Sequence, residues 1–323
     1  MAAGENPLDP DARDPLGRDA SPDARALPAL RPGPQSILPG DAPFWLPGRL
    51  RDDWRELVDR ASRLPTRLNE YGFDPFGYDP AYTIPMMLPM LFFYRTWFRV
   101  DAQGIDHVPE GRVLLIGNHA GNTFAWDGAM LAASLFLDGE PPRVVRGMAE
   151  YYLPQIPFFN VWMHRMGSVV GTPENCVELL EQGEAVMVFP EGQRGFIKPY
   201  TQAYELQRFG LGFLRLALET DTPIVPVGIV GSEETSPGIA RLESLARWLG
   251  APALPLTLTM PWLGAAGMIP LPSKFHLRFG TPLRFVGDPN DEDAVIQRHV
   301  DVVKDRIRGL VAEGLAARRG WFA

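Results

Sequence analysis

The chain contains little cysteine, and its net charge is negative. Its 323 residues include one cysteine, Cys176, and their net charge at pH 7 is −8. A single cysteine cannot form an intrachain disulfide framework, which fits a reducing compartment. Affinity for nucleic acid depends on clustered cations, so a chain of this net charge is not expected to have a nucleic-acid partner.

Long apolar runs and metal-ligand spacings are also missing from the sequence. No run reaches the roughly 20 apolar residues that a membrane-spanning helix needs, and residues 1–15 lack the apolar core of a secretory signal. The five histidines show no metal-ligand spacing, so neither a metal nor another cofactor is expected. Hydrophobic residues still make up 46% of the chain, which is typical of a globular protein with a sizeable core.

The first hundred residues divide into two parts. Residues 1–40 are rich in Pro, Ala, Asp and Arg with few large apolar side chains, so we expect them to be disordered or loosely attached. Residues 41–97 form a helical segment, in which apolar residues recur at helical spacing from Leu50 to Leu64 and residues 81–94 carry no charge. The uncharged stretch fits either a core helix or a helix lying in a membrane interface.

Strands and helices alternate through residues 98–323. This alternation predicts an α/β fold with a mixed, largely parallel, twisted sheet flanked by helices. The predicted strands are 98–102, 113–117, 143–148, 168–171, 185–189, 224–230, 274–279 and 282–285. The predicted helices begin at Asp127 and cover 157–166, 173–182, 209–220, 238–249 and 291–319.

One apolar segment interrupts the alternation. Residues 252–272 contain no charge, and their prolines and small residues argue against a long helix. Such a segment either packs over the sheet or dips into lipid. Together with residues 81–94, it favours a monotopic membrane protein.

The stretch VLLIGNHAGNTFAWD, residues 113–127, carries the first candidate chemistry. A buried strand ends at Asn118 and His119, and a helix begins near Asp127. Open α/β sheets place their active sites at such strand ends. A neutral imidazole can act as a general base, and a carboxylate on its other nitrogen would fix the tautomer. The alternative is a strand-end histidine with a satisfied ring beside a helix-capping aspartate.

The second candidate is PEGQRG, residues 190–195, which follows the apolar strand AVMVF. If the two strands are neighbours in one sheet, Glu191 and Arg194 come to lie beside His119. Arg194 would offer a planar cation suited to a phosphate or carboxylate. Glu191 would orient a substrate hydroxyl or hold Arg194. Taken alone, this motif favours a surface turn with a local Glu–Arg pair.

Three blocks in order resemble the glycerolipid acyltransferase superfamily, the lysophospholipid acyltransferase-like enzymes. They are GNHAGNTFAWD at 117–127, FPEGQR at 189–194 and PIVPVGIVG at 223–231, and the resemblance covers about residues 97–285. The sequence of these blocks is similar to that of the monoacylglycerol and diacylglycerol acyltransferase-like branch and its bacterial relatives.

The sequence departs from the family pattern at three places. Seven residues separate His119 from Asp127 where the family has four, and Gln193 stands where Thr is usual. Residues 166–184 lack the arginine of the family's second block. In the family that arginine is associated with a phosphate-bearing acceptor, so its absence weakens assignment to lysophosphatidate, although Arg165 or Arg194 could substitute.

The resemblance implies that residues 98–323 form an acyltransferase domain. It would move an acyl chain from acyl-CoA or acyl-carrier protein to a hydroxyl of a glycerolipid, either a lysophospholipid or a mono- or diacylglycerol. His119 would be the general base and Asp127 would orient it. The resemblance also implies substrate-binding roles for Asn118, Glu191, Gly192 and Arg194, with backbone amides near Gly192 or Gly121 receiving the oxyanion.

These implications set the expected partners and two alternatives. The partners are an acyl thioester donor, a glycerolipid acceptor and a membrane surface, and the expected location is peripheral or monotopic on the cytoplasmic face of a membrane. The same base could instead activate water in a lipid or thioester hydrolase, although no Gly-x-Ser-x-Gly elbow occurs. A non-catalytic lipid-binding protein on the same scaffold is the other alternative.

Overall fold

The computed structural model describes residues 38–65, 74–151, 153–155, 158–241 and 255–322. The segment predicted to be disordered, residues 1–40, therefore lies almost entirely outside the described residues. The described strands form one seven-stranded sheet and a separate pair, β7 (Gly238–Arg241) with β8 (Pro255–Thr257).

The large sheet is mixed and mostly parallel, as the alternation predicts. Its spatial order is β1-β9-β6-β2-β5-β3-β4. β2, β3, β4, β5 and β6 run in one direction, and β9 pairs antiparallel with β6 and parallel with β1. The bounds are β1 (Asp101–Gln103), β2 (Val113–Gly117), β3 (Val145–Ala149), β4 (Val169–Val170), β5 (Ala185–Val188), β6 (Ile224–Val230) and β9 (His276–Phe279).

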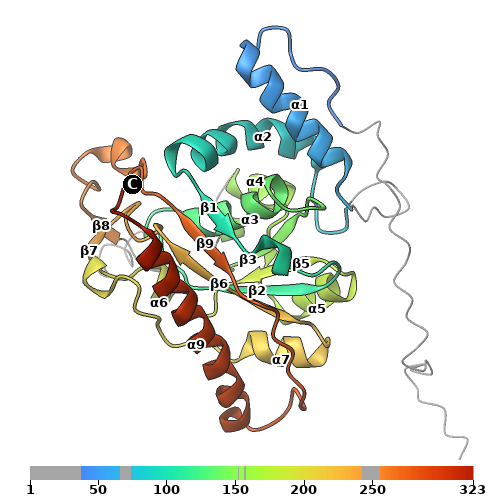
Figure 1. Ribbon diagram of the computed structural model, residues 1–323, viewed down its shortest axis with the longest axis vertical. Helices are drawn as coiled ribbons and strands as arrows, with labels where there is room; N and C mark the ends of the chain where they lie inside the picture. The colour runs from blue at the N-terminus through green and yellow to red at the C-terminus, as the bar shows by residue number, and fades with distance from the viewer. Residues whose placement is uncertain (1–37, 66–73, 152, 156–157, 242–254, 323) are drawn as a thin grey trace, which may run out of the picture.

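Helices cover both faces of this sheet (Figure 1). Val113 and Leu115 of β2 point into one apolar core, and Leu114 and Ile116 point into the other, because successive side chains of a strand face opposite ways. The first core packs under α1 (Gly48–Ser62), α2 (Pro80–Phe92) and α3 (Trp126–Leu137). The second packs under α5 (Pro173–Glu181), α7 (Gly212–Glu219) and α9 (Asp293–Ala317).

The uncharged stretch 81–94 forms α2 and the start of a π-helical turn, η2 (Phe93–Trp97). Asp79 caps α2 by accepting hydrogen bonds from the amides of Ala81 and Tyr82. The face of α2 that carries Ile84 and Met87 is buried in the first core, so this face of the helix is a core element. Phe92, at its end, is half exposed.

Two predicted elements differ from the structure. The helix predicted over 238–249 is wrong at its start, because Gly238–Arg241 is the strand β7; residues 242–249 lie outside the described residues. The strand predicted over 282–285 is reduced to a single bridge between Leu283 and Ile224. Among the described residues, no helix is long and apolar enough to cross a bilayer.

Candidate active site

The two predicted motifs meet at one edge of the sheet. β2 pairs in parallel with β5, with Ile116 opposite Val188. Because parallel strands end at the same edge, the segment after β2 and the segment after β5 emerge side by side. The predicted neighbourhood of the two strands is therefore confirmed.

His119 and Asp127 form a hydrogen-bonded pair at this edge. The distance from His119 Nδ1 to Asp127 Oδ2 is 2.7 Å, and Asp127 is fully buried. Asp127 Oδ2 also accepts from the amide of Ala120, and its Oδ1 accepts from the amide of Gly128, each at 2.7 Å. A carboxylate with three donors is an acceptor only, so His119 carries its proton on Nδ1 and its Nε2 is the basic nitrogen.

A tight loop accommodates the seven-residue spacing. Gly121 has a φ of +142°, and a Cβ placed there would lie 2.4 Å from the carbonyl oxygen of Phe124. Asn122 follows with a φ of +56°. The chain thus folds back on itself between His119 and Asp127, and the three additional residues do not separate the pair.

Two aromatic rings enclose the imidazole. The His119 ring stacks on Phe189 with centroids 4.3 Å apart and planes 8° apart. On its other side lies Phe196, with centroids 5.0 Å apart. The His119 side chain remains 14% exposed. The ring is therefore held in one plane while part of it still reaches solvent. The sequence analysis missed Phe196, which lies beyond the FPEGQR block.

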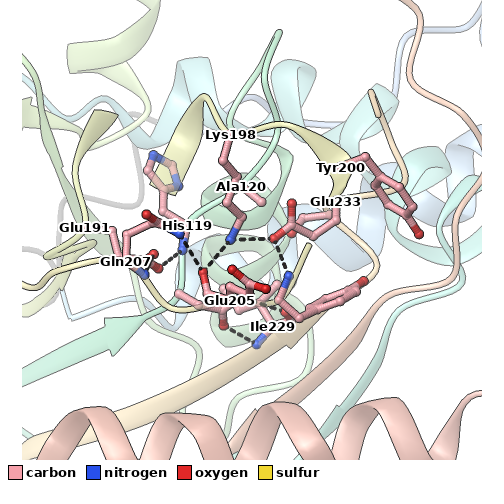
Figure 2. A network of polar contacts seen from close by, with 12 residues as sticks. His119, Ala120, Glu191, Lys198, Tyr200, Glu205, Gln207, Ile229 and Glu233 are labelled. Carbon is pink, nitrogen blue, oxygen red and sulfur yellow. Dashed lines mark hydrogen bonds and ion pairs between the residues drawn. The ribbon is translucent and has the colours of Figure 1, made fainter. Parts of the chain in front are cut away.

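Glu191 contacts backbone in this structure. It is buried, its Oε1 accepts from the amide of His119 at 3.0 Å, and its Oε2 accepts from the amide of Gln207 at 2.6 Å (Figure 2). Both oxygens thus tie together two loops beside the imidazole. We therefore assign Glu191 to positioning His119, in place of the contact with a substrate hydroxyl or with Arg194 that the sequence suggested.

Asn118 also faces inward. Its side chain is fully buried and pairs with Ile229 of β6, donating to the carbonyl oxygen at 2.9 Å and accepting from the amide at 2.8 Å. These two bonds continue the pairing of β2 with β6 by one residue beyond Gly117. The side chain fixes where the strand ends, and it does not face a substrate as the resemblance implied.

Gly192 and Arg194 have different environments. The amide of Gly192 donates to the carbonyl oxygen of Phe189 at 3.0 Å, so it is not a free donor for an oxyanion. Arg194 is exposed on the short helix α6 (Gln193–Phe196), and it makes no hydrogen bond or ion pair with any residue that the structure describes. A Cβ on the adjacent Gly195 would lie 3.0 Å from the carbonyl oxygen of His119, so α6 packs directly on the histidine loop.

A buried polar network lies beside the two loops that Glu191 joins (Figure 2). The sequence analysis missed this network. Lys198 and Glu233 are almost completely buried and form an ion pair of 2.7 Å. The neighbouring Glu234 accepts from the hydroxyls of Tyr200 and Tyr204 and pairs with Arg318 at 2.6 Å. The signal in the sequence was the acidic GSEET that follows the apolar strand β6.

Glu233 gives the fold a pH dependence. Burial raises its pKa from 4.5 to about 7, against the opposing effect of Lys198. The folded state therefore binds the proton more tightly than the unfolded state, so the stability from this group is complete below pH 4.5 and is lost as the pH rises through 7.

We predict that Glu233→Gln removes this contribution. The free energy of unfolding of the wild type, measured relative to the variant by chemical denaturation, should fall by about 2 kcal/mol between pH 5 and pH 8. Titrating groups that do not interact with Glu233 cancel in this difference. An unchanged difference across that range would contradict the prediction.

The arginine missing from residues 166–184 has no replacement at the same place. Thr172 lies between β4 and α5. It caps α5 by accepting a hydrogen bond from the amide of Asn175 at 3.1 Å. Arg165 is exposed and lies over the ring of Tyr82.

Within the described residues, no group of three or more His, Cys, Asp or Glu side chains could hold a metal ion.

Comparison with known proteins identifies the family. The family model described as Acyltransferase matches residues 99–230. An uncharacterized protein of Mycobacterium tuberculosis is 35% identical over 279 residues, covering 84% of this chain and 78% of its own length. The chain belongs to the glycerolipid acyltransferase superfamily.

Two further matches carry names that refer to lipid synthesis or to acyl transfer. A Bos taurus protein named DGAT1/2-independent enzyme synthesizing storage lipids is 23% identical over 219 residues, covering 67% of this chain and 60% of that one. The crystal structure of the 1-acyl-sn-glycerophosphate (LPA) acyltransferase PlsC from Thermotoga maritima is 20% identical, covers 74% of this chain and 83% of that chain, and has a TM-score of 0.46. The chain is an O-acyltransferase of this superfamily.

Proposed function

We propose that His119 is the general base in transfer of an acyl chain from a thioester donor to a glycerolipid hydroxyl. The observation that carries this proposal is the 2.7 Å bond from His119 Nδ1 to the buried Asp127, which leaves Nε2 as the basic atom of a partly exposed ring. A histidine held in this way can accept a proton and remain stabilised as imidazolium.

The proposed reaction needs no covalent intermediate on the enzyme. Nε2 removes the proton of the acceptor hydroxyl as its oxygen attacks the thioester carbonyl carbon. The tetrahedral intermediate collapses, the C–S bond breaks, and the imidazolium returns the proton to the departing thiolate. The products are an ester and a free thiol, so atoms and charge balance.

The environment of Asp127 argues against the non-catalytic alternative. A non-catalytic lipid-binding protein has no need for a fully buried carboxylate with three donors beside a partly exposed imidazole, because that arrangement serves to stabilise imidazolium. Hydrolysis would use the same base, and only the fate of the acyl group separates it from transfer.

We propose a neutral acceptor, a mono- or diacylglycerol, at the cytoplasmic face of a membrane. Residues 166–184, where the family has its phosphate-associated arginine, contain no arginine here, and the hydroxyl of Thr172 in this stretch is used in capping α5. The bovine relative's name, which refers to storage lipids, agrees with a neutral acceptor.

An acceptor panel tests this assignment. With one labelled acyl-CoA, we expect kcat/KM to be at least tenfold higher for monoacylglycerol or diacylglycerol than for lysophosphatidate or glycerol 3-phosphate. A preference of the same size for either phosphate-bearing acceptor would contradict the neutral assignment while leaving acyl transfer intact.

Arg194 is the proposed contact for the phosphates of an acyl-CoA donor. Arg194 belongs to α6, which packs on the histidine loop through Gly195. Its exposed guanidinium has no hydrogen-bond or ion-pair partner among the described residues, and a planar cation suits phosphate. Arg194→Gln should raise the KM for acyl-CoA about tenfold and leave kcat unchanged, because an exposed ion pair contributes binding that is uniform through the reaction.

Steady-state kinetics with acyl-CoA as the varied substrate measures this effect. Arg306→Gln is the matched control, because Arg306 is an exposed arginine on α9 and its loss changes the net charge equally. Equal KM values for wild type and Arg194→Gln would contradict the assigned role.

A further inference from the structure

The segment after β8 exposes an unusual amount of apolar surface. In residues 258–269, the side chains of five large apolar residues are each 55% to 69% exposed, namely Leu258, Trp262, Leu263, Met268 and Ile269. No charged residue lies among them. We define these five side chains as the apolar loop surface. Isolated exposed apolar residues are ordinary in soluble proteins, but five within twelve residues mark an interaction site.

Several backbone groups of this loop are hydrogen-bonded within the loop itself. The amides of Leu263, Gly264, Ala266 and Ile269 each donate to a carbonyl oxygen within the same segment. The Thr259 hydroxyl donates to Gly267 O at 2.8 Å, and the Thr257 hydroxyl accepts from the amide of Met260 at 2.9 Å. A segment that enters lipid must satisfy its polar groups in this way, because the bilayer core supplies no partners.

The segment that carries the apolar loop surface is joined to η2 and to the end of α2. Trp97 of η2 donates from Nε1 to Pro270 O at 3.0 Å, and the half-exposed Phe92 stacks near Trp97 with centroids 6.1 Å apart. Figure 1 shows the segment after β8 beside the end of α2. The segment that follows residues 258–269 is therefore bonded to η2, whose Trp97 lies beside the half-exposed Phe92.

A second connection runs to the histidine loop. The amide of Leu258 donates to Pro237 O, and the amide of Leu271 donates to Thr235 O. Between these two anchors, Ser236 accepts a hydrogen bond from Asn122 at its carbonyl oxygen and bonds Thr123 through its hydroxyl, each at 2.9 Å. One short segment thus holds both the apolar loop surface and the loop between His119 and Asp127.

From these observations we propose that residues 258–269 insert into the interfacial region of a phospholipid bilayer and so hold the loop between His119 and Asp127 near the membrane surface. The inference rests on the proposed glycerolipid acceptor, whose chains lie in the bilayer. Because the chain is acidic and the loop uncharged, insertion is hydrophobic: it should occur with zwitterionic lipid and should not weaken in high salt.

Flotation of the whole chain with phosphatidylcholine vesicles tests the proposal without any acyl-transfer substrate. The wild type should float with the vesicles equally in 0.1 M and 1 M NaCl, where the Debye length is about 10 Å and 3 Å. The double variant Trp262→Ser/Leu263→Ser should partition at least about 100-fold more weakly, because two large side chains no longer leave water. Trp45→Ser is the matched control, since Trp45 and Trp262 are both 69% exposed.

Fluorescence locates the inserted side chain directly. With brominated phosphatidylcholine, we expect quenching of the wild type that Trp262→Phe loses and Trp45→Phe retains. Trp262→Phe keeps an apolar ring, so its partitioning should stay near the wild-type value. An unchanged unfolding midpoint for the Ser variants shows that the loop side chains do not hold the fold together.

Several outcomes would overturn the insertion proposal. One is that Trp262→Ser/Leu263→Ser partitions into vesicles as strongly as the wild type, and another is that the wild type loses binding in 1 M NaCl. A third is that the wild type self-associates and this double variant does not, which would assign the surface to a second copy of the chain. His119→Ala should float as the wild type does. Vesicle binding without acyl transfer would refute the proposed function alone, and acyl transfer without vesicle binding would refute the insertion alone.

Discussion

Replacing His119 by Ala should lower kcat for acyl transfer by about 10³-fold, within the range that a general base contributes. The reason is that Nε2 of this ring is the basic atom oriented by Asp127, and alanine leaves nothing to accept the proton of the acceptor hydroxyl. His119→Gln should lose as much, because its amide cannot take up a proton although it is polar.

The controls separate chemistry from folding. Removing a ring that stacks between Phe189 and Phe196 leaves a gap, so the unfolding midpoint of each variant must be measured beside its kinetics. His299→Ala is the matched histidine control, because His299 packs on Phe285 along α9 and should retain near wild-type kcat. Retention of more than a tenth of the activity in both His119 variants would contradict the base assignment.

Replacing Arg146 by Ala should lower the free energy of unfolding by about 3–5 kcal/mol. Arg146 of β3 is buried and bonds Asp74 at 2.5 Å and Glu184 at 3.3 Å. Without the guanidinium, the buried Asp74 carboxylate would lose its cation, and Glu184 would keep only its interaction with Arg143. Denaturant titration at constant pH measures the loss.

A surface pair provides the comparison. Arg63 contacts Asp59 and Glu140 at about the same distances, but its side chain is 43% exposed. Arg63→Ala should therefore cost less than about 1 kcal/mol. Replacing Asp74 by Asn in the Arg146→Ala background should recover part of the larger loss, because one uncompensated charge is removed. Equal small losses at Arg146 and Arg63 would contradict the account of the buried network.

The sequence predicted the strands of the sheet well because they are short, continuous apolar runs. β2, β5 and β6 are buried on both faces, so their patterns leave little choice of structure. β7 was missed because Gly238–Arg241 becomes a strand by pairing with β8, and the long-range partner is not visible in the local sequence. The interior prolines of α2 left its environment undecided until its buried face was known.

The site shows the same division between local and distant determinants. His119 and Asp127 could be singled out because strand ends and helix starts are local features. The partners of Glu191 and Asn118 could not, because those side chains bond backbone groups at Gln207 and Ile229, far away in the sequence. The Lys198–Glu233 pair was missed for the same reason.

The most direct test of acyl transfer through His119 is the fate of the label from labelled acyl-CoA, with and without monoacylglycerol, followed for wild type and His119→Ala in parallel. We predict that the wild type converts the label into acylglycerol ester at a rate that depends on the acceptor, and that His119→Ala forms about 10³-fold less. Release of the label as free fatty acid at one rate, whether or not the acceptor is present, would contradict the account.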